Sequence, residues 1–204
     1  AIKFSSTEVL ATLWSLSSGH ISIGAVGAQK ISSTNFEDLL KATDTAVSQS
    51  LGDKELPAAQ TIFGVSPDWI AEGKIVPEKL ALIRRLCKEL DLRPLGYVQP
   101  FEALENYLKE TEGAPLTAIL ISLDAQKGWV TLIRAGKNLG TVTLTEGTPL
   151  GIEQALKTFT QIDVLPARMI IYDGHRDLKA LEETIMAYPW TKLLPFLHFP
   201  RVEI

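Results

Sequence analysis

The chain alternates short β-prone runs with longer segments whose apolar residues recur at helical spacing, and the same order of elements occurs twice. Three β-prone runs, separated by short polar turns, open each half. They lie at 1–4, 8–16 and 20–28 in the first half and at 117–123, 128–134 and 139–145 in the second half. Each set predicts a three-stranded antiparallel meander.

Helical and β-prone segments follow each meander. In the first half, Asn35 is a candidate N-cap for a helix that runs to Leu51, and Pro77 is a favourable first residue for a second helix. Later strands are expected at 60–65, 95–98, 168–172 and 196–204, and later helices at 100–110, 151–159 and 177–187. Because helical crossovers join parallel strands, each half is expected to form a mixed α/β sheet.

The two halves are separated near Gly113, so the predicted subdomains are residues 1–113 and 114–204. The element order is βββαβαβα, and the last helix is missing from the second half, which stops at Ile204. We therefore expect a fragment of a longer protein. We also expect the sheet face that the missing helix would cover to be left open, because an apolar face in water is costly and marks a missing segment or a bound chain.

Composition limits the classes of function. Lys and Arg number 20 against 24 Asp and Glu, a formal net charge of -4, so bulk nucleic-acid binding is disfavoured. The single cysteine, Cys87, cannot form an internal disulfide or a cysteine-based zinc site, which favours a reducing, cytoplasmic compartment. Apolar runs fall short of the ~20 residues that a membrane helix needs, so no direct membrane insertion is expected.

The duplicated element order resembles the actin-like ATPase superfamily, whose two tandem subdomains share a ribonuclease H-like fold. Local sequence supports the resemblance. The segments 76–92 and 96–104 look like the superfamily's helix, loop and "EP" segment, and 171–178 resembles the strand, glycine turn and helix that hold the adenosine. The likeness covers nearly the whole chain, and the absence of large inserts makes PilM- and FtsA-type proteins the nearer relatives.

The chemistry of this superfamily needs two hairpins, each with an aspartate followed by glycine and a hydroxyl residue, to hold Mg²⁺, the attacking water and the phosphates. Alignment on the first hairpin puts Lys3 at the aspartate and Ser5 at the glycine. In the second hairpin, Ser122 falls at the aspartate position and Asp124 lies two residues late, on a turn. A cation and a hydroxyl thus stand where the resemblance places metal-organising carboxylates.

The other nucleotide motifs are also reduced. Gln99 stands where the superfamily carries a catalytic-side glutamate, and of the glycine-rich adenosine turn only Gly174 remains, flanked by Asp173 and His175. Larger side chains would then line a backbone that must approach a nucleotide closely. No catalytic residue and no metal ligand is predicted. If nucleotide binding is retained, Asp124, Asp173 and Gly174 are the candidate cofactor-binding residues.

The resemblance implies three candidate functions. The first is a non-catalytic scaffold or adaptor, a pseudo-ATPase without a cofactor, that docks a protein partner such as the cytoplasmic tail of a membrane protein. The alternative is a nucleotide-binding ATPase with an altered metal site, which would bind ATP and Mg²⁺. A small-molecule kinase is the third and the least supported. The protein is expected in the cytoplasm, where it would reach a membrane only through a partner or through segments outside this sequence. Whether the chain self-associates is left open.

Overall fold

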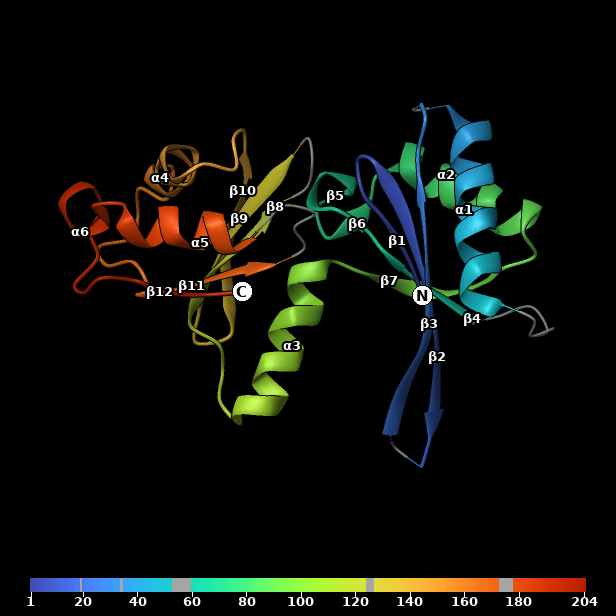
Figure 1. The fold of residues 1–204 in the computed structure, drawn as a ribbon, viewed down its shortest axis with the longest axis horizontal. Helices are drawn as coiled ribbons and strands as arrows, with labels where there is room; N and C mark the ends of the chain where they lie inside the picture. The colour runs from blue at the N-terminus through green and yellow to red at the C-terminus, as the bar shows by residue number, and fades with distance from the viewer. Residues whose placement is uncertain (19, 34, 53–59, 124–126, 173–177) are drawn as a thin grey trace. The chain divides into compact units, whose positions relative to one another are not determined.

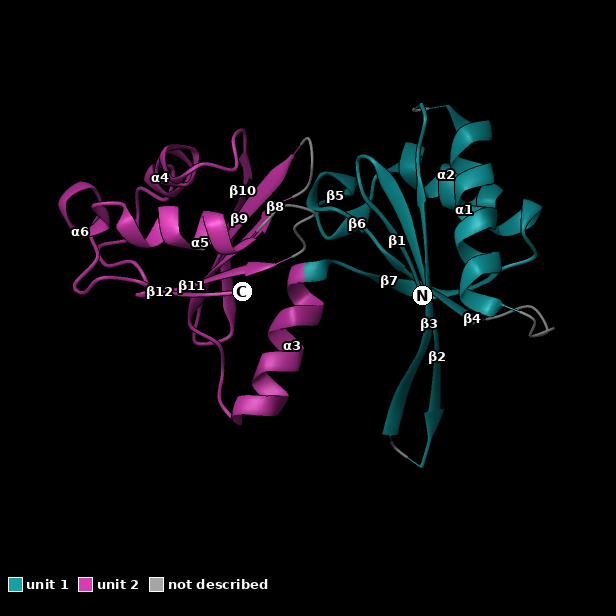
Figure 2. Cartoon of the chain, viewed as in Figure 1, with its two compact units in different colours: residues 1–100 teal, residues 101–204 magenta. Residues whose placement is uncertain are grey.

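The computed structural model describes residues 1–18, 20–33, 35–52, 60–123, 127–172 and 178–204. These residues form two compact units, 1–100 and 101–204 (Figure 2). Each unit is built on its own five-stranded mixed sheet (Figure 1). Two separate sheets, each containing an antiparallel meander, confirm the predicted duplicated α/β fold.

The sheet of the first unit has the strand order β3-β2-β1-β4-β7. Its meander comprises β1 (Ile2–Phe4), β2 (Glu8–Ser17) and β3 (His20–Lys30), and its other two strands, β4 (Gln60–Gly64) and β7 (Arg93–Val98), run parallel to β1. A 3-10 helix (Pro67–Trp69) and a small hairpin of β5 (Ile70–Ala71) and β6 (Lys74–Ile75) follow β4 in the chain. The distal halves of β2 and β3 extend beyond the other strands of this unit (Figure 1).

Two helices cover one face of this sheet. The first, α1 (Phe36–Leu51), begins where the Asn35 side chain accepts a hydrogen bond from the backbone N–H of Asp38 at 2.8 Å. The second, α2 (Pro77–Glu89), begins at the predicted proline. Apolar side chains of both helices join those of β1, β2 and β4 in one core, whose fully buried members include Val9, Ala46 and Leu86. Burial of the two apolar helix faces holds both helices on the sheet.

The sheet of the second unit has the strand order β10-β9-β8-β11-β12. Its strands are β8 (Ala118–Leu123), β9 (Gly128–Arg134), β10 (Lys137–Leu144), β11 (Arg168–Tyr172) and β12 (Arg201–Glu203). Its helices are α3 (Pro100–Glu112), α4 (Pro149–Lys157), α5 (Leu178–Ala187) and α6 (Trp190–Leu193). The larger core lies on one face of the sheet, where α4, α5 and α6 pack around Ile152 and Trp190. Among the described residues, no helix is both long and apolar enough to cross a membrane.

Helix α3 packs against the second sheet, in a separate cluster. Phe101 is buried there with Leu120 and Ile170, and Leu104 and Leu108 pack against the same cluster. The sequence analysis placed this helix in the first subdomain, ended that subdomain at residue 113, and expected an open face on the second sheet. The expectation of an open face is wrong, because α3 covers this part of the second sheet. Apolar spacing shows that a helix has a buried side, but it does not show which sheet that side meets.

Ion pairs fix the end of α3 to the sheet. The guanidinium of Arg168 on β11 donates to both carboxylate oxygens of Glu112, at 2.7 and 2.9 Å, and to both of Glu203, at 2.8 and 3.0 Å. The hydrogen bond from Arg168 lowers the pKa of Glu112, and the two carboxylates raise the pKa of Arg168. One arginine therefore joins α3, β11 and β12.

Candidate functional site

The turn between β1 and β2 is where the resemblance places the first phosphate-binding hairpin. The Ser5 Oγ accepts hydrogen bonds from the backbone N–H groups of Thr7, at 3.3 Å, and Glu8, at 3.1 Å. The backbone N–H of Ser5 donates to the Glu8 carbonyl at 3.0 Å. The hydroxyl therefore stabilises its own turn, as serine side chains commonly do at such positions.

Lys3 occupies the middle of β1, at the position aligned with the first metal-organising aspartate. Its backbone is flanked by Leu10 on β2 and Gly64 on β4. The side chain lies against Gly64, since a Cβ added to that glycine would stand 3.2 Å from both Cβ and Cγ of Lys3. A half-buried ammonium side chain is thus attached where the superfamily's chemistry calls for an anion.

Ser122 occupies the corresponding position in the second unit. It is only 5% exposed, and it lies on β8 between Trp129 of β9 and Tyr172 of β11. Its carbonyl comes so close to Gly128 that a Cβ there would be 2.6 Å from the oxygen. A buried neutral hydroxyl on a crowded central strand supplies no charge to a metal ion.

The three predicted cofactor-binding residues, Asp124, Asp173 and Gly174, lie outside the described residues, so the structure neither brings them together nor separates them. Gln99 stands between the end of β7 and the start of α3. Across the part of the chain that the structure describes, no three His, Cys, Asp or Glu side chains form a group that could hold a metal ion.

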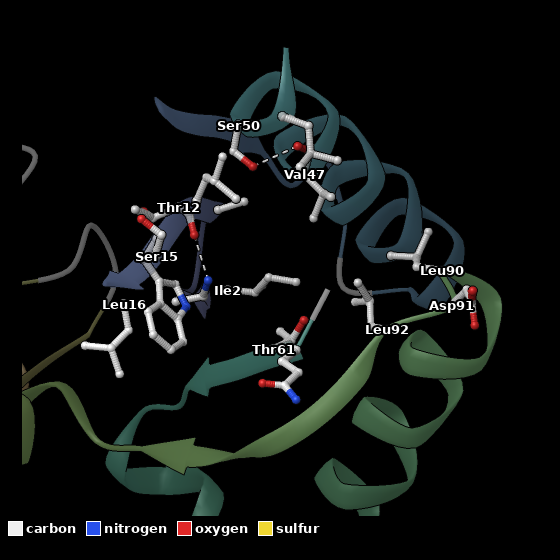
Figure 3. A pocket seen from close by; sticks show the side chains of 16 residues that line it. Ile2, Thr12, Ser15, Leu16, Val47, Ser50, Thr61, Leu90, Asp91 and Leu92 are labelled. Atoms are coloured by element: carbon white, nitrogen blue, oxygen red, sulfur yellow. Dashed lines mark hydrogen bonds between the residues drawn. The ribbon is translucent and has the colours of Figure 1, made fainter. Parts of the chain in front are cut away.

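A hollow of about 660 Å³ lies in the first unit, at the opposite end of the parallel strands from the Ser5 turn (Figure 3). We call it the amino-end hollow, because it is lined by residues at the starts of β1 and β4 and by residues just before β7. Further lining residues come from the second half of β2 and the end of α1. The lining side chains include Trp14, Leu16, Val47, Leu51, Asp91 and Leu92. The sequence analysis did not predict this site.

The distal part of β2 and β3 forms an amphipathic ribbon beside this hollow. The direct pairs Trp14–Ile23 and Leu16–Ile21 place four apolar side chains on one face, whereas the alternate pairs contain Ser15, Ser17, His20 and Ser22. Leu16, Ile21 and Ile23 are 63%, 68% and 72% exposed. Alternating apolar residues past the length of β1 were the signal in the sequence that could have located this surface.

Strand β1 is short compared with β2, its neighbour in the sheet. Strand β1 pairs with β2 only from Val9 to Ala11, and the last backbone contacts join Ala1 to Thr12. Within the described ranges, no strand pairs with residues 13–17 of β2 on that side.

The carboxyl group of Glu153, whose pKa is lowered, contributes to packing within the second unit. Buried Glu153 on α4 accepts hydrogen bonds from Lys157 Nζ at 2.5 Å and from the Tyr188 hydroxyl. The hydrogen bond from Lys157 is the main cause that lowers the pKa of Glu153, and the bond from Tyr188 adds to it. The same bond to Glu153 raises the pKa of Tyr188. The arrangement joins α4 to the segment after α5, which is a structural role.

No family model matches the sequence, and no curated protein matches it. Solved structures do match the fold. A chain of the PilM-PilN type IV pilus biogenesis complex has a TM-score of 0.62 at 10% identity, over 100% of this chain and 87% of that one. The inorganic polyphosphate/ATP-glucomannokinase from Arthrobacter sp. strain KM has a TM-score of 0.59 at 13% identity, over 99% and 89%.

The ethanolamine utilization protein EutJ from Carboxydothermus hydrogenoformans has a TM-score of 0.58 at 11% identity, over 99% of this chain and 82% of that one. All three share the actin-like ATPase fold. At 10–13% identity they show the fold alone. They confirm the actin-like fold that the sequence predicted, and the same fold serves both a pilus assembly complex and a kinase.

Proposed function

We propose that this chain, which has the actin-like ATPase fold, is a non-catalytic scaffold that docks a protein segment from a membrane-associated assembly. One observation carries the proposal: Lys3, aligned with the first metal-organising aspartate, lies half-buried against Gly64 on a central strand. A lysine there repels Mg²⁺ and leaves the phosphates without the metal that neutralises them.

The second unit supports the same proposal. Ser122, aligned with the second aspartate, is buried on β8 and carries no charge. Loss of a charged group from a transition-state site typically costs several kcal/mol of stabilisation. Two such losses on two strands argue against phosphoryl transfer more strongly than either does alone.

The docking role draws support from the neighbour with a TM-score of 0.62, which belongs to a complex of two proteins. A fold of this kind can therefore serve as one member of a pilus assembly pair. We propose that the partner of this chain is likewise a protein. This partner would be the cytoplasmic tail of a membrane protein, through which the chain reaches the membrane. The amphipathic ribbon of β2 and β3 offers an apolar surface for such a partner.

A nucleotide-binding ATPase with an altered metal site is the second candidate. The glucomannokinase neighbour favours it, since that protein is named for a reaction with ATP and has the same fold. Under this candidate, Asp124, Asp173 and Gly174 would be the residues that hold ATP.

Titration calorimetry and phosphate release with ATP and Mg²⁺ separate the two candidates. The scaffold proposal expects no saturable binding up to about 1 mM ATP and no turnover above background. A gain of Mg²⁺-dependent binding in the double variant Lys3→Asp with Ser122→Asp, but not in the control Lys3→Met, would support the assignment of these positions. Micromolar binding by the unaltered chain that is lost in Asp124→Ala would refute the proposal and favour the ATPase.

Photo-crosslinking in the native cells tests the docking role. The expected product joins this chain to the soluble segment of a membrane-associated protein, and the purified segment should then bind the purified chain at a 1:1 ratio. Failure of every crosslinked segment to bind the purified chain would contradict the scaffold role.

A further inference from the structure

We propose that two copies of this chain associate by packing the apolar face of the amphipathic ribbon against the same face of the other copy. We call this surface the ribbon face and define it by Leu16, Ile21, Ile23 and Val26. Three of these residues lie on β3, which β2 separates from β1 in the sheet, so their exposure does not depend on what pairs with β2 beside β1. The inference concerns the isolated chain and goes beyond the proposed docking role.

The ribbon belongs to the longest uncharged stretch of the sequence. No Asp, Glu, Lys or Arg occurs between Glu8 and Lys30. At the chain's average of 22% charged residues, the segment 9–29 would carry about four or five of them. Burial of the ribbon face therefore takes no ion out of water, whereas burial of an ordinary charged surface does. The cores of protein interfaces are depleted of charged residues in the same way.

The ribbon face also gathers the most exposed apolar side chains. Among the described residues, six large apolar side chains are at least 60% exposed, and four of these six form the ribbon face. They stand in three adjacent rows of cross-strand pairs, which are Leu16–Ile21, Trp14–Ile23 and Thr12–Val26. A contiguous apolar patch of this kind on an exposed surface marks an interaction site.

The order of side chains along the face matches a second copy of the chain. The base of the ribbon carries the cross-strand pair Glu8–Lys30, and its tip carries Ser17–His20. Two ribbons related by a two-fold axis perpendicular to them run in opposite directions, so the base of each lies beside the tip of the other. Like charges are then kept apart, and Ile23, in the middle row, lies nearest the axis. Such a contact is self-complementary, and it closes at two copies.

Two features of β3 favour contact through the ribbon face over pairing through the outer edge of the strand. The backbone N–H of Ala28 already donates to Oε1 of Gln49 at 3.0 Å. An extra residue on β3 between Ile23 and Val26 also interrupts the regular ladder. Natural sheets use such features to block edge pairing. Two ribbon faces would instead lie about 10 Å apart with their side chains interdigitated, as in stacked sheets.

Sedimentation equilibrium of the 204-residue chain measures the association. Because few side chains form the ribbon face, the contact belongs to the small and weak class of interfaces, and we expect a dissociation constant of about 1–100 µM. The average mass should rise from that of the monomer to that of the dimer between about 1 µM and 500 µM, and no further.

Variants locate the contact. Ile23→Ser should raise the dissociation constant at least about tenfold, while the matched control Leu95→Ser, at an exposed apolar residue on β7 of the same sheet, should leave it within about twofold. Ile23→Lys and Ile23→Glu should each be monomeric, because two like charges would meet near the axis. An equimolar mixture of these two variants should form a dimer at low salt.

Chemical crosslinking separates face packing from edge pairing. In a Cys87→Ser background, a short bismaleimide should join two copies of Ile23→Cys. It should not join two copies of Ser22→Cys, because that neighbouring side chain points to the opposite side of the ribbon. Thermal unfolding of each variant checks that the chain still folds.

Three results would overturn the inference. One is a monomer at every concentration up to about 500 µM. Another is a dimer that Ile23→Ser leaves unchanged. The third is equal crosslinking through Ser22→Cys and Ile23→Cys, which would assign the contact to the edge of β3. Each of these leaves the scaffold proposal standing, whereas ATP turnover would refute the scaffold proposal and leave the dimer unaffected.

Discussion

Substitution of Gly27 tests the packing of α1 on the long strand β3. A Cβ on Gly27 would stand 1.9 Å from the carbonyl oxygen of Ala46 and 2.8 Å from Cβ of Gln49. The first of these is a backbone atom in the middle of α1, so no side-chain rotation can relieve the clash, and the helix must move away from the sheet. Overpacking of this kind costs about 1–3 kcal/mol, and the rigid neighbour argues for the upper end of that range.

Calorimetric melting of Gly27→Ala against the unaltered chain measures this cost. For a unit of 100 residues, about 3 kcal/mol corresponds to a decrease in Tm of roughly 10–20 °C for the first unit. The matched control is Gly24→Ala on the same strand, where a Cβ would lie 3.4 Å from Cβ of Leu13, an ordinary contact. That variant should stay within about 0.5 kcal/mol of the unaltered chain. If Gly27→Ala proved as stable as Gly24→Ala, α1 would not cross β3 at this glycine, and the described packing would be wrong.

Three further substitutions test the second unit. Phe101→Ala should destabilise it by about 3 kcal/mol in urea unfolding, because the ring is buried in the cluster under α3, whereas Tyr107→Ala on the exposed side of the same helix should change stability by less than about 0.5 kcal/mol. Arg168→Ala should destabilise the unit at neutral pH. The folded-state pKa of Glu112 is lowered from its ordinary value of 4.5, so the stability it contributes is present above that value and lost on protonation. Calorimetry should therefore show the difference in stability from the unaltered chain shrinking as the pH falls below 4.5. Trp190→Phe should cost about 1 kcal/mol in urea unfolding, because the Ile185 carbonyl of α5 loses its 2.7 Å hydrogen bond from the indole N–H and keeps the one from the Tyr188 backbone N–H at 3.2 Å.

Local features of the fold were predictable from the sequence. The meander of the first unit was expected at 1–4, 8–16 and 20–28, and its strands are Ile2–Phe4, Glu8–Ser17 and His20–Lys30. Alternation and hydroxyl-rich turns are properties of a few neighbouring residues, so they can be read without knowledge of the partner strands. The cap at Asn35 has the same local origin, because its hydrogen bond reaches only to Asp38.

Features that depend on distant residues were not predictable in the same way. The apolar side of α3 was evident from Phe101, Leu104 and Leu108, but its meeting with the second sheet depends on side chains of β8 and β11. A strand was expected at 196–204, whereas the structure has only the short strand Arg201–Glu203, which follows the short helix α6. The amino-end hollow was missed because its lining comes from β2, the end of α1 and the loop before β7, which are far apart in the sequence. The candidate residues Asp124, Asp173 and Gly174 lie outside the described residues and stay predictions.

The two ends of the parallel strands in the first unit differ in chemistry. In α/β sheets, ligands usually bind at the carboxyl ends of the strands. Here that end carries the Ser5 turn, closed by its own hydrogen bonds, and the cationic side chain of Lys3 stands on β1 beside it. The apolar hollow lies at the amino ends of the strands. The three-residue strand β1 therefore runs from the apolar hollow to the turn where the resemblance places the first phosphate-binding hairpin. If the chain is a scaffold, as proposed, substitutions at Lys3 should leave binding of the crosslinked partner segment unchanged, because no nucleotide chemistry would depend on that side chain.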